Sequence, residues 1–527
     1  MMPGPGMAAG GGARSLRQLL SGIVDAPDDV AVSDLTLDSR EVSPGALFLA
    51  CRGERRGNGR HGIEFAAQAS ERGARAVVYE TPAAGETRAQ EAAARLLQRV
   101  RQRAGQDEEQ FVVAVPDLRA HLGVIADRFF GQPSQALHVV GITGTNGKTT
   151  CAWLIAQALT RCGRPAAYIG TLGYGATDAL RPSAHTTSDV VSVHRQLASV
   201  RAAGAAAVAM EVSSHALDQG RVDAVRFDAA AFTNLTQDHL DYHGTMQAYG
   251  AAKARLFARP TLTARVINID DAFGRELALT PGAPGRLVVT ARAAQPASQA
   301  HVIATQVRAR TDGLDLTLSS SFGDAQLSVS LLGDFNVDNI LTTLAVLLAT
   351  QIPLAAALDA LAQCVAAPGR MQRVAAVGAA THPTVIVDYA HSPDALEKAL
   401  AAARAHCRGR LHLVFGCGGD RDQLKRPIMG RIAATGADAV TVTDDNPRTE
   451  DPAAIVRDIL AGIPGTCDTV RVEHDRATAI GDAIRAGANG DLVLIAGKGH
   501  ETYQIYGTTF RVFSDERVAR GVLAGLS

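Results

Sequence analysis

Short runs of apolar residues recur along the chain, and most of them end in glycine, aspartate, asparagine or serine. Continuous apolar runs of this length are typical of strands buried on both faces of a parallel sheet. The alanine- and leucine-rich stretches between them are typical of helices, so the pattern predicts an α/β protein. Ligands of such sheets lie beyond the carboxyl ends of the strands. The runs span 137–144, 206–214, 229–235, 384–391, 411–419, 439–446 and 491–499.

Two breaks divide this pattern into three parts, which is close to the domain count expected at about 150 residues per domain. The first break is FFGQPSQALH (129–138), and the second is AAPGRMQRV (366–374). We predict an N-terminal α/β domain over 1–135 with a flexible tail over 1–15. A central domain with a mostly parallel sheet follows over 136–367, and a C-terminal Rossmann-like α/β domain over 368–527. The Ala-, Arg-, Glu- and Gln-rich segment 80–110 predicts a solvated surface helix with loops.

Composition narrows the function class. The 527 residues are 46% hydrophobic and 20% charged, with a net charge of −1, which is ordinary for a soluble globular protein and gives no sign of nucleic-acid binding. Seven cysteines without a C-x-x-C pair argue against a disulfide framework or structural zinc, and favour a reducing cytoplasm. The N-terminus lacks the features of a signal peptide. No apolar run is long enough to cross a bilayer.

The segment GITGTNGKTT (141–150) follows the first central strand. The common phosphate-loop pattern would place a glycine at position 142, where this chain has Ile142. Glycines that let the backbone approach a phosphate, a lysine for the terminal phosphates and a hydroxyl for a metal nevertheless follow in order. This favours a phosphate site over an ordinary turn. The predicted ATP-binding residues here are Gly144, Thr145, Asn146, Gly147, Lys148, Thr149 and Thr150.

Further polar positions follow the central strands. Glu211 ends the run 206–211 and, beside a phosphate loop, is better placed to hold Mg²⁺ than to cap a helix. His239 and His243 have the i, i+4 spacing of a zinc helix, but Leu240 replaces the glutamate of H-E-x-x-H, which argues against a metalloprotease. Lys253 lies in an alanine-rich stretch and would alone be taken as solvated.

GTNGKTT resembles the variant phosphate loop of the Mur ligase and folylpolyglutamate synthase superfamily. EVSSH (211–215), TNLTQDHLDYH (233–243) and the Ala-Lys pair at 252–253 resemble Mur ligases more closely. The resemblance implies a P-loop ATPase as the central domain, with Thr149 and Glu211 holding one Mg²⁺. It implies that His239 and a carbamylated Lys253 hold a second. Lys148 and Lys253 become candidate catalytic residues, and His215 a candidate general base.

The same resemblance places four further residues at the adenine and ribose of ATP, where amide side chains can read a base edge. A helix N-cap or a turn is the equal alternative for each asparagine. Arg370 is assigned to the ATP site with them. The four are Asn268, Asp271, Asn336 and Asn339.

LTLDSREVSPGALFLACRG (35–53) resembles the uridine-nucleotide-binding domain of the Mur ligases that add the third peptide residue. SAHTTSD (183–189) resembles a substrate loop of the central domain. The loop GERRGNGRHG (53–62) differs from that family's pattern, so Glu54 to Arg56 are not assigned as contacts. An arginine in this set could bind a carboxylate or pyrophosphate, with a surface salt bridge as the alternative. The implied UDP-substrate contacts are Leu37, Ser39, His185, Thr186, Thr187, Ser213, Gln219 and Arg221.

The last third resembles the amino-acid-adding domain of these ligases. A diamino dicarboxylic acid needs cations for two carboxylates and anions for two ammonium groups. DNPR (445–448) resembles the form found in enzymes that select meso-diaminopimelate. GCGGDRD (416–422) is not G-x-G-x-x-G, which weakens a dinucleotide site as the alternative. The implied amino-acid contacts are Arg421, Asp445, Asn446, Pro447, Arg448, Gly497 and Glu501.

The resemblance therefore implies an ATP- and Mg²⁺-dependent amide ligase of peptidoglycan synthesis. It would join meso-2,6-diaminopimelate to the D-Glu γ-carboxylate of UDP-N-acetylmuramoyl-L-alanyl-D-glutamate through an acyl phosphate. We expect a cytoplasmic monomer that binds these small molecules but neither nucleic acid nor membrane. A folylpolyglutamate synthase is the nearest alternative, but it should lack the 35–53 block and DNPR. A regulatory or transport P-loop ATPase would explain only residues 141–150.

Overall fold

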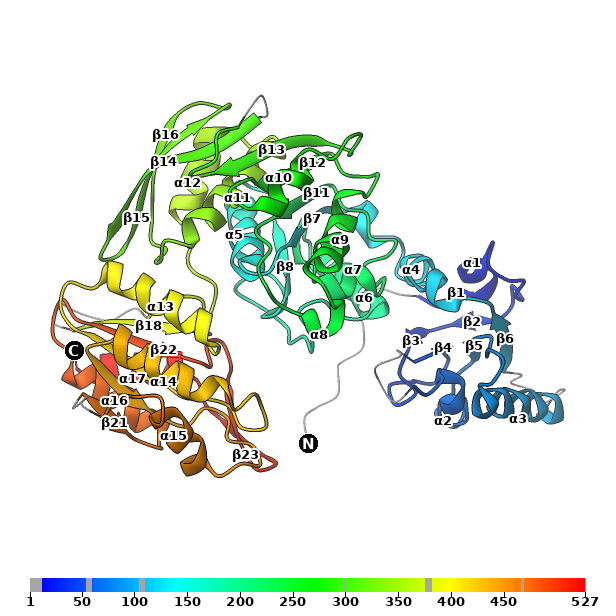
Figure 1. Cartoon of the computed structure of the whole chain (residues 1–527). Coiled ribbons are helices and arrows are strands. Elements are labelled where there is room, and N and C mark those ends of the chain that lie inside the picture. Colours follow the sequence, from blue (N-terminus) through cyan, green and yellow to red (C-terminus); the bar gives the residue numbers. More distant parts are fainter. Residues whose placement is uncertain are drawn as a thin grey trace.

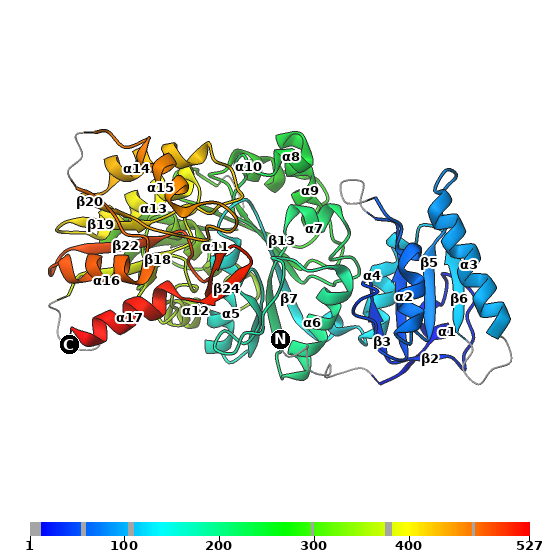
Figure 2. The ribbon, with the colours of Figure 1, turned by 90° about the horizontal axis from the view of Figure 1, so that it is seen from below.

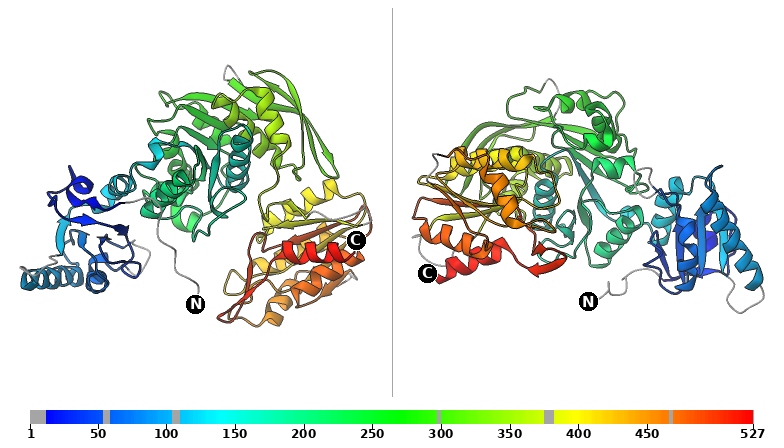
Figure 3. Two further views of the ribbon diagram at one scale, coloured as in Figure 1. Left: turned by 180° about the vertical axis from the view of Figure 1, so that it is seen from behind. Right: turned by 60° about the horizontal axis from the view of Figure 1, so that its bottom comes forward.

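The computed structural model describes residues 12–53, 59–103, 110–296, 300–374, 382–465 and 469–526. Three lobes follow one another along the chain, each built around its own sheet, and the central lobe lies between the other two (Figures 1 and 3). The predicted α/β class and three-part architecture are confirmed. The domain boundaries at 135 and 367 stay predictions, although both fall between the sheets.

The N-terminal lobe holds a four-stranded parallel sheet in the order β3-β4-β5-β6. In Figure 2 helix α3 lies at the outer side of this lobe, away from the central lobe. Ala89, Ala93 and Leu96 of α3 are buried, so the predicted surface helix also packs against its own lobe. The elements are β1 (Arg14–Ser15), α1 (Leu16–Leu20), β2 (Ala31–Val32), β3 (Asp34–Thr36), β4 (Ala46–Ala50), α2 (Ala66–Glu71), β5 (Ala76–Glu80), α3 (Thr87–Arg103), β6 (Phe111–Val115) and α4 (Leu118–Phe129).

The tail prediction for 1–15 is wrong at its end. Arg14 and Ser15 form β1 and pair with Val32 and Ala31 of β2, and Leu16 directly after them is fully buried. Ordered structure therefore begins before the predicted end of the tail. Residues 1–11, and the unassigned loop positions Glu54 to Arg56, lie outside the described residues.

The central lobe holds a ten-stranded sheet in the order β16-β15-β14-β13-β12-β11-β7-β10-β8-β9, parallel from β8 to β14. Antiparallel strands extend it at both edges. The elements are β7 (His138–Thr143), α5 (Lys148–Arg161), β8 (Ala166–Gly170), β9 (Gly173–Gly175), α6 (Val190–Ala202), β10 (Ala207–Glu211), α7 (Ser214–Asp218), β11 (Ala229–Phe232), α8 (Leu240–His243), α9 (Met246–Phe257), β12 (Ala264–Asn268), α10 (Ala272–Ala278), β13 (Arg286–Ala291), β14 (Ala300–Arg310), β15 (Gly313–Ser320), β16 (Ala325–Val329), α11 (Asn336–Ala349) and α12 (Leu354–Ala362).

Both faces of this sheet are covered, which explains the continuous apolar runs. In β7, Val140 and Ile142 pack into the core shared with α5 and α11, whereas Val139 faces the core on the α6 side. Ile142 is thus a fully buried strand residue. A glycine there would leave a hole in the core, which accounts for the missing glycine of the phosphate-loop pattern.

The C-terminal lobe holds a six-stranded sheet in the order β17-β18-β22-β19-β20-β21, parallel except at β17. Helices α13 to α15 cover one face, and α16 and α17 the other. The elements are β17 (Gln372–Arg373), β18 (Thr384–Asp388), α13 (Pro393–His406), β19 (Leu411–Phe415), α14 (Lys425–Gly436), β20 (Ala439–Val442), α15 (Pro452–Leu460), β21 (Val470–Val472), α16 (Arg476–Ala486), β22 (Leu492–Ala496), β23 (Tyr503–Tyr506), β24 (Thr509–Val512) and α17 (Asp515–Gly525).

His406, the last residue of α13, joins the central and C-terminal lobes. The N–H of Gly333 donates to its Nε2 at 2.8 Å, so the ring proton must be on Nδ1, which donates to the carbonyl of Arg310 at 2.5 Å. The side chain is buried. Both ring nitrogens of a neutral histidine are therefore used between the lobes.

Replacing His406 with alanine is expected to destabilise this junction by about 2 to 4 kcal/mol, because it leaves one buried N–H and one buried carbonyl unpaired. Chemical denaturation and hydrogen exchange at Gly333 would measure the loss. Lys398→Ala, at an exposed position on the same helix, is the control and should change neither. Unchanged exchange at Gly333 in the His406 variant would contradict the prediction.

Candidate active site

The loop between β7 and α5 has the geometry of a phosphate site. Gly147 is the residue before α5 and has φ +84°, and Gly144 has φ +151°. A Cβ at Gly144 would overlap Thr233 Oγ1, and one at Gly147 would overlap Asn339 Oδ1. Only glycine fits at either position, and the loop delivers its backbone to the N-terminus of a 14-residue helix, where anions bind.

Neighbouring residues brace this loop from outside. Thr233 Oγ1 donates to the carbonyl of Asn146 at 2.6 Å, and the Asn146 N–H donates to Asn234 Oδ1 at 2.9 Å. Lys148 Nζ donates to the carbonyls of Gly144 and Thr145 at 2.9 and 2.8 Å. Within the described residues Lys148 has no carboxylate partner. Its charge is therefore available to an anion placed over the loop.

Glu211 and Thr149 meet beside the loop, because β10 lies next to β7. Thr149 Oγ1 donates to Glu211 Oε2 at 2.9 Å, and Glu211 is only 1% exposed. Its Oε1 accepts from the hydroxyl of Tyr168 and from the Thr171 N–H. No ion pair reaches Glu211 from the described part of the chain. A buried carboxylate next to a hydroxyl, with neutral donors alone, fits a Mg²⁺ site that keeps few protein ligands.

Lys253, on α9, is 1% exposed, and its Nζ donates to the same Gly144 carbonyl at 2.8 Å. It lies 4.2 Å from the ring centroid of Tyr249. Burial, aided by repulsion from Lys148, lowers the pKa of Lys253 to about 6. Its amine is thus mostly neutral at pH 7, and a neutral amine is the form that reacts with CO₂. This fits the predicted carbamate, which remains a prediction.

The histidines lie beside this lysine. The His239 ring centroid lies 6.1 Å from that of Tyr249 and 4.8 Å from that of His215. Burial, aided by the neighbouring histidines, lowers the pKa of His215 to about 4. Such a ring is a poor proton acceptor, so the structure gives the general-base hypothesis little support.

No group of three His, Cys, Asp or Glu side chains in the described ranges could hold a metal. The two predicted ligand sets do not contain three such side chains, because one uses the Thr149 hydroxyl and the other a modified Lys253. One member of each set nevertheless lies at the same loop: Thr149 follows its last glycine, and Lys253 bonds to the Gly144 carbonyl.

The predicted adenine side chains are engaged by the protein itself. Asp271 caps α10 by accepting from the Gly274 N–H at 3.1 Å. The amides of Asn268 and Asn336 donate to the carbonyls of Thr233 and Leu332, and Asn339 donates to Asn336 Oδ1. These three asparagines are buried, and Asn339 Oδ1 lies against Gly147 of the loop. Their contact with ATP stays a prediction.

Arg370 lies in the segment that leads to the C-terminal lobe. Its guanidinium stands 4.8 Å from the ring centroid of Tyr389, and its buried Nε has no hydrogen-bond partner in the described part of the chain. Its positive charge is close enough to Lys148 to help lower the pKa of that lysine, although burial of Lys148 is the larger cause. The charge of this linker residue therefore acts on Lys148 of the phosphate loop, and its contact with ATP stays a prediction.

Part of the predicted UDP-substrate set gathers next to Glu211. Thr187 Oγ1 donates to the Glu211 carbonyl at 2.8 Å and accepts from the Ser213 N–H, while Arg221 donates to the Thr187 carbonyl. Thr186 Oγ1 lies 3.0 Å from Thr171 Oγ1. The remaining members are placed differently: Gln219 donates to Tyr242, His185 is exposed, and Leu37 and Ser39 lie in the N-terminal lobe.

The predicted amino-acid set follows the carboxyl ends of β19, β20 and β22. Asn446 Nδ2 donates to Glu501 Oε2 at 2.9 Å. Arg448 has φ +53°, and its Nη1 donates to the Gly419 carbonyl at 2.7 Å. Gly497 lets the Asp445 carboxylate come close to the backbone, and Pro447 and Arg421 flank the group. Cations and carboxylates therefore stand side by side here, as a zwitterionic ligand requires.

Three buried side chains were missed by the prediction: Tyr168 at Glu211, Tyr249 at Lys253 and Lys498 at Glu501. Lys498 stands in IAGKGHE directly after a strand, so its position could have signalled a role. Nothing in the pattern around the tyrosines distinguishes them from core residues.

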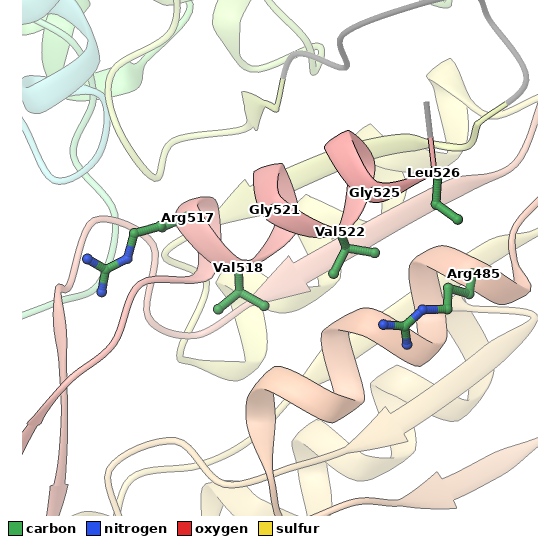
Figure 4. A pocket seen from close by; sticks show the side chains of 7 residues that line it. All are labelled: Arg485, Arg517, Val518, Gly521, Val522, Gly525 and Leu526. Carbon is green, nitrogen blue, oxygen red and sulfur yellow. The ribbon is translucent and has the colours of Figure 1, made fainter.

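A hollow of about 410 Å³ lies between α16 and α17 (Figure 4). Its lining combines aliphatic side chains with glycines and two arginines, and it includes no predicted site residue. It is not a candidate for the reaction. Its lining residues are Arg485, Arg517, Val518, Gly521, Val522, Gly525 and Leu526.

Three family profiles match the chain in succession: the Mur ligase family, catalytic domain over 31–130, the Mur ligase middle domain over 142–347, and the Mur ligase, glutamate ligase domain over 369–499. The chain belongs to the Mur ligase family. Relatives named UDP-N-acetylmuramoyl-L-alanyl-D-glutamate–2,6-diaminopimelate ligase include those of Xanthomonas campestris, 49% identical with 97% of both chains covered, and of Pseudomonas aeruginosa, 46% identical with 97% of this chain and 98% of that one.

Solved structures agree with this Mur ligase assignment. One ligase of that same name aligns with a TM-score of 0.68 at 33% identity, over 97% of this chain and 99% of that one. A folylpolyglutamate synthase of Mycobacterium tuberculosis aligns with a TM-score of 0.56 at 19% identity, over 71% of this chain and 92% of that one, which shows a shared fold alone. None of the helices that the structure describes is long and apolar enough to span a membrane.

Proposed function

We propose that this Mur ligase joins meso-2,6-diaminopimelate to the D-Glu γ-carboxylate of UDP-N-acetylmuramoyl-L-alanyl-D-glutamate, using ATP. The observation that carries this is near-full-length identity of 46% and 49% to relatives named for that reaction. The amino-acid site fits, because Arg448 lies in the same cluster as Glu501 and Asp445. Tripeptide formation and phosphate release with purified protein test it directly.

The chemistry begins with an unreactive carboxylate. Transfer of the ATP γ-phosphoryl group to the γ-carboxylate releases ADP and gives an acyl phosphate. A neutral amine of the diamino acid then attacks the acyl carbon, and the tetrahedral intermediate loses the amine proton and releases phosphate to form the amide. Lys148 and the backbone N–H groups of the loop stabilise charge on the transferring group. Thr149 and Glu211 would hold one Mg²⁺, which would supply positive charge to the phosphate oxygens. His239 and carbamylated Lys253 would hold the second ion.

The lobes supply the reactants from three sides. The N-terminal lobe, with Leu37 and Ser39, binds the uridine nucleotide. Thr186, Thr187 and Arg221 place the peptide end of that substrate near Glu211, and the C-terminal lobe presents the amino acid. Bringing the lobes together would exclude water from the acyl phosphate, which water would otherwise hydrolyse. We further propose that the protein is cytoplasmic and monomeric. A dimer in sedimentation experiments would contradict the monomeric state.

Arg448 is proposed to select an amino acid with a second carboxylate. Arg448→Ala is expected to lower kcat/KM for meso-diaminopimelate by about 10- to 100-fold, the effect of one lost hydrogen bond to a charged group, while activity with lysine stays low and nearly unchanged. Kinetics with both amino acids measure this. Equal efficiency of the unaltered protein with lysine would refute the selectivity.

A folylpolyglutamate synthase remains the alternative with the same phosphate loop. Phosphate release on adding a folate and glutamate, but not with UDP-N-acetylmuramoyl-L-alanyl-D-glutamate and meso-diaminopimelate, would favour it. The matched N-terminal block over 31–130 supports the first proposal instead.

A further inference from the structure

Lys498 is a fully buried lysine at the carboxyl end of β22, between Gly497 and Gly499. Its Nζ donates to Asn446 Oδ1 at 3.0 Å and to Glu501 Oε2 at 2.9 Å. The ring centroid of Tyr503 lies 5.6 Å from the same nitrogen. A buried ammonium is costly unless it is paired, so this arrangement is held by specific contacts.

These contacts fix the orientation of the Asn446 amide. Its Oδ1 accepts from Lys498 and from the Ile505 N–H at 3.1 Å, and its Nδ2 donates to Glu501 Oε2 at 2.9 Å. Turning the amide over would place its Nδ2 against two donors and its Oδ1 against a carboxylate. The Asn446 side chain is therefore held in one orientation by its contacts within the protein.

The same contacts use one oxygen of Glu501 but leave the Asp445 carboxylate without a hydrogen bond from the described residues. Glu501 Oε2 accepts from Lys498 and Asn446, whereas its Oε1 accepts no hydrogen bond from the residues that the structure describes. Asp445 is 8% exposed, and its carboxylate accepts no hydrogen bond from the described residues. Two acceptors thus remain beside one buried cation, and a ligand with two ammonium groups would match them.

We propose that Lys498 is a positioning residue for the amino-acid site. It locks Asn446 and one oxygen of Glu501, and so presents Glu501 Oε1 and Asp445 to the ammonium groups of the incoming diamino acid. This inference rests on the proposed function. Lys498 itself does not touch the substrate; it acts through the two side chains that it holds.

The test uses the full chain and four variants: Lys498→Met, Glu501→Gln, the double variant Lys498→Met/Glu501→Gln, and Lys398→Met. Methionine keeps the length of the lysine stem and removes its charge. Lys398 is an exposed lysine of the same lobe and provides the matched control. The KM of each substrate, kcat and the thermal midpoint are measured for every protein.

Lys498→Met is expected to raise the KM for meso-diaminopimelate by about 10- to 100-fold, since a charge-assisted contact that orients the acceptor is lost. The KM values for ATP and the UDP-dipeptide should change by less than about twofold. The double variant should have nearly the same KM for meso-diaminopimelate as Glu501→Gln alone, because residues that act as a unit are not additive. Lys398→Met should match the unaltered protein.

An unchanged KM for meso-diaminopimelate in folded Lys498→Met would overturn the inference, and so would equal changes in all three KM values. If Lys498→Met does not fold, Glu501→Gln and the double variant decide, since the neutral pair leaves no buried charge unpaired. A higher KM for meso-diaminopimelate in the double variant than in Glu501→Gln alone would then overturn it. Failure of the unaltered protein to use meso-diaminopimelate would instead overturn the proposed function, and this inference with it.

Discussion

Lys148→Ala is expected to lower kcat/KM for ATP by about three orders of magnitude, which is the scale for removing a cation that stabilises a transferring phosphoryl group. Among the described residues, Lys148 Nζ bonds only to the carbonyls of Gly144 and Thr145. No carboxylate in the described chain competes for its charge. Phosphate release in the presence of both other substrates measures the loss.

The same variant should fold, because Lys148 takes part in no ion pair that the structure describes. An unchanged thermal midpoint separates lost catalysis from lost structure. Lys398→Ala, which removes an exposed lysine, should keep full activity. Phosphate release at the original rate in Lys148→Ala would exclude this loop as the nucleotide site and remove the basis of the ligase mechanism.

Lys253→Ala is expected to lower activity by about 100-fold or more, the scale for loss of a ligand that holds a catalytic cation. The unaltered protein should lose activity in CO₂-free buffer and regain it with bicarbonate. Carbamate formation consumes the neutral amine, and the pKa of Lys253 is about 6. Lowering the pH through 6 protonates the amine, so the carbamate and the activity should fall there and be retained above it.

Carbon-13 NMR with labelled bicarbonate would detect the carbamate. Lys253→Ala should lose that signal and Lys398→Ala should keep it, since Lys398 is exposed and paired with Asp394. Full activity without CO₂, together with the absence of a carbamate signal, would contradict the prediction.

Much of the fold could be predicted because the sheets are buried on both faces. Each predicted run from 137–144 to 491–499 contains a strand, from β7 to β22. The strand β1 could not be found in this way, because two residues show no periodicity and its pairing with β2 is tertiary. The phosphate loop was recognisable because its glycines are required. A side chain at Gly144 would overlap Thr233, and one at Gly147 would overlap Asn339.

The chemistry of individual side chains was harder to foresee. Lys253 and Lys498 are polar in the sequence yet buried, because the site pairs one with a carbonyl and an aromatic ring and the other with a carboxylate. Asn336 and Asn339 bond to the protein, which an amide motif alone does not reveal. Such roles depend on contacts between residues far apart in the chain.

Asn339 lies directly beneath Gly147, although it belongs to α11 and follows the loop by almost two hundred positions. Helix α11 also fills one face of the central core. An isolated nucleotide-binding fragment must therefore extend through α11. A truncation placed after the antiparallel strands would retain every residue of the loop motif and still lose the support that shapes it.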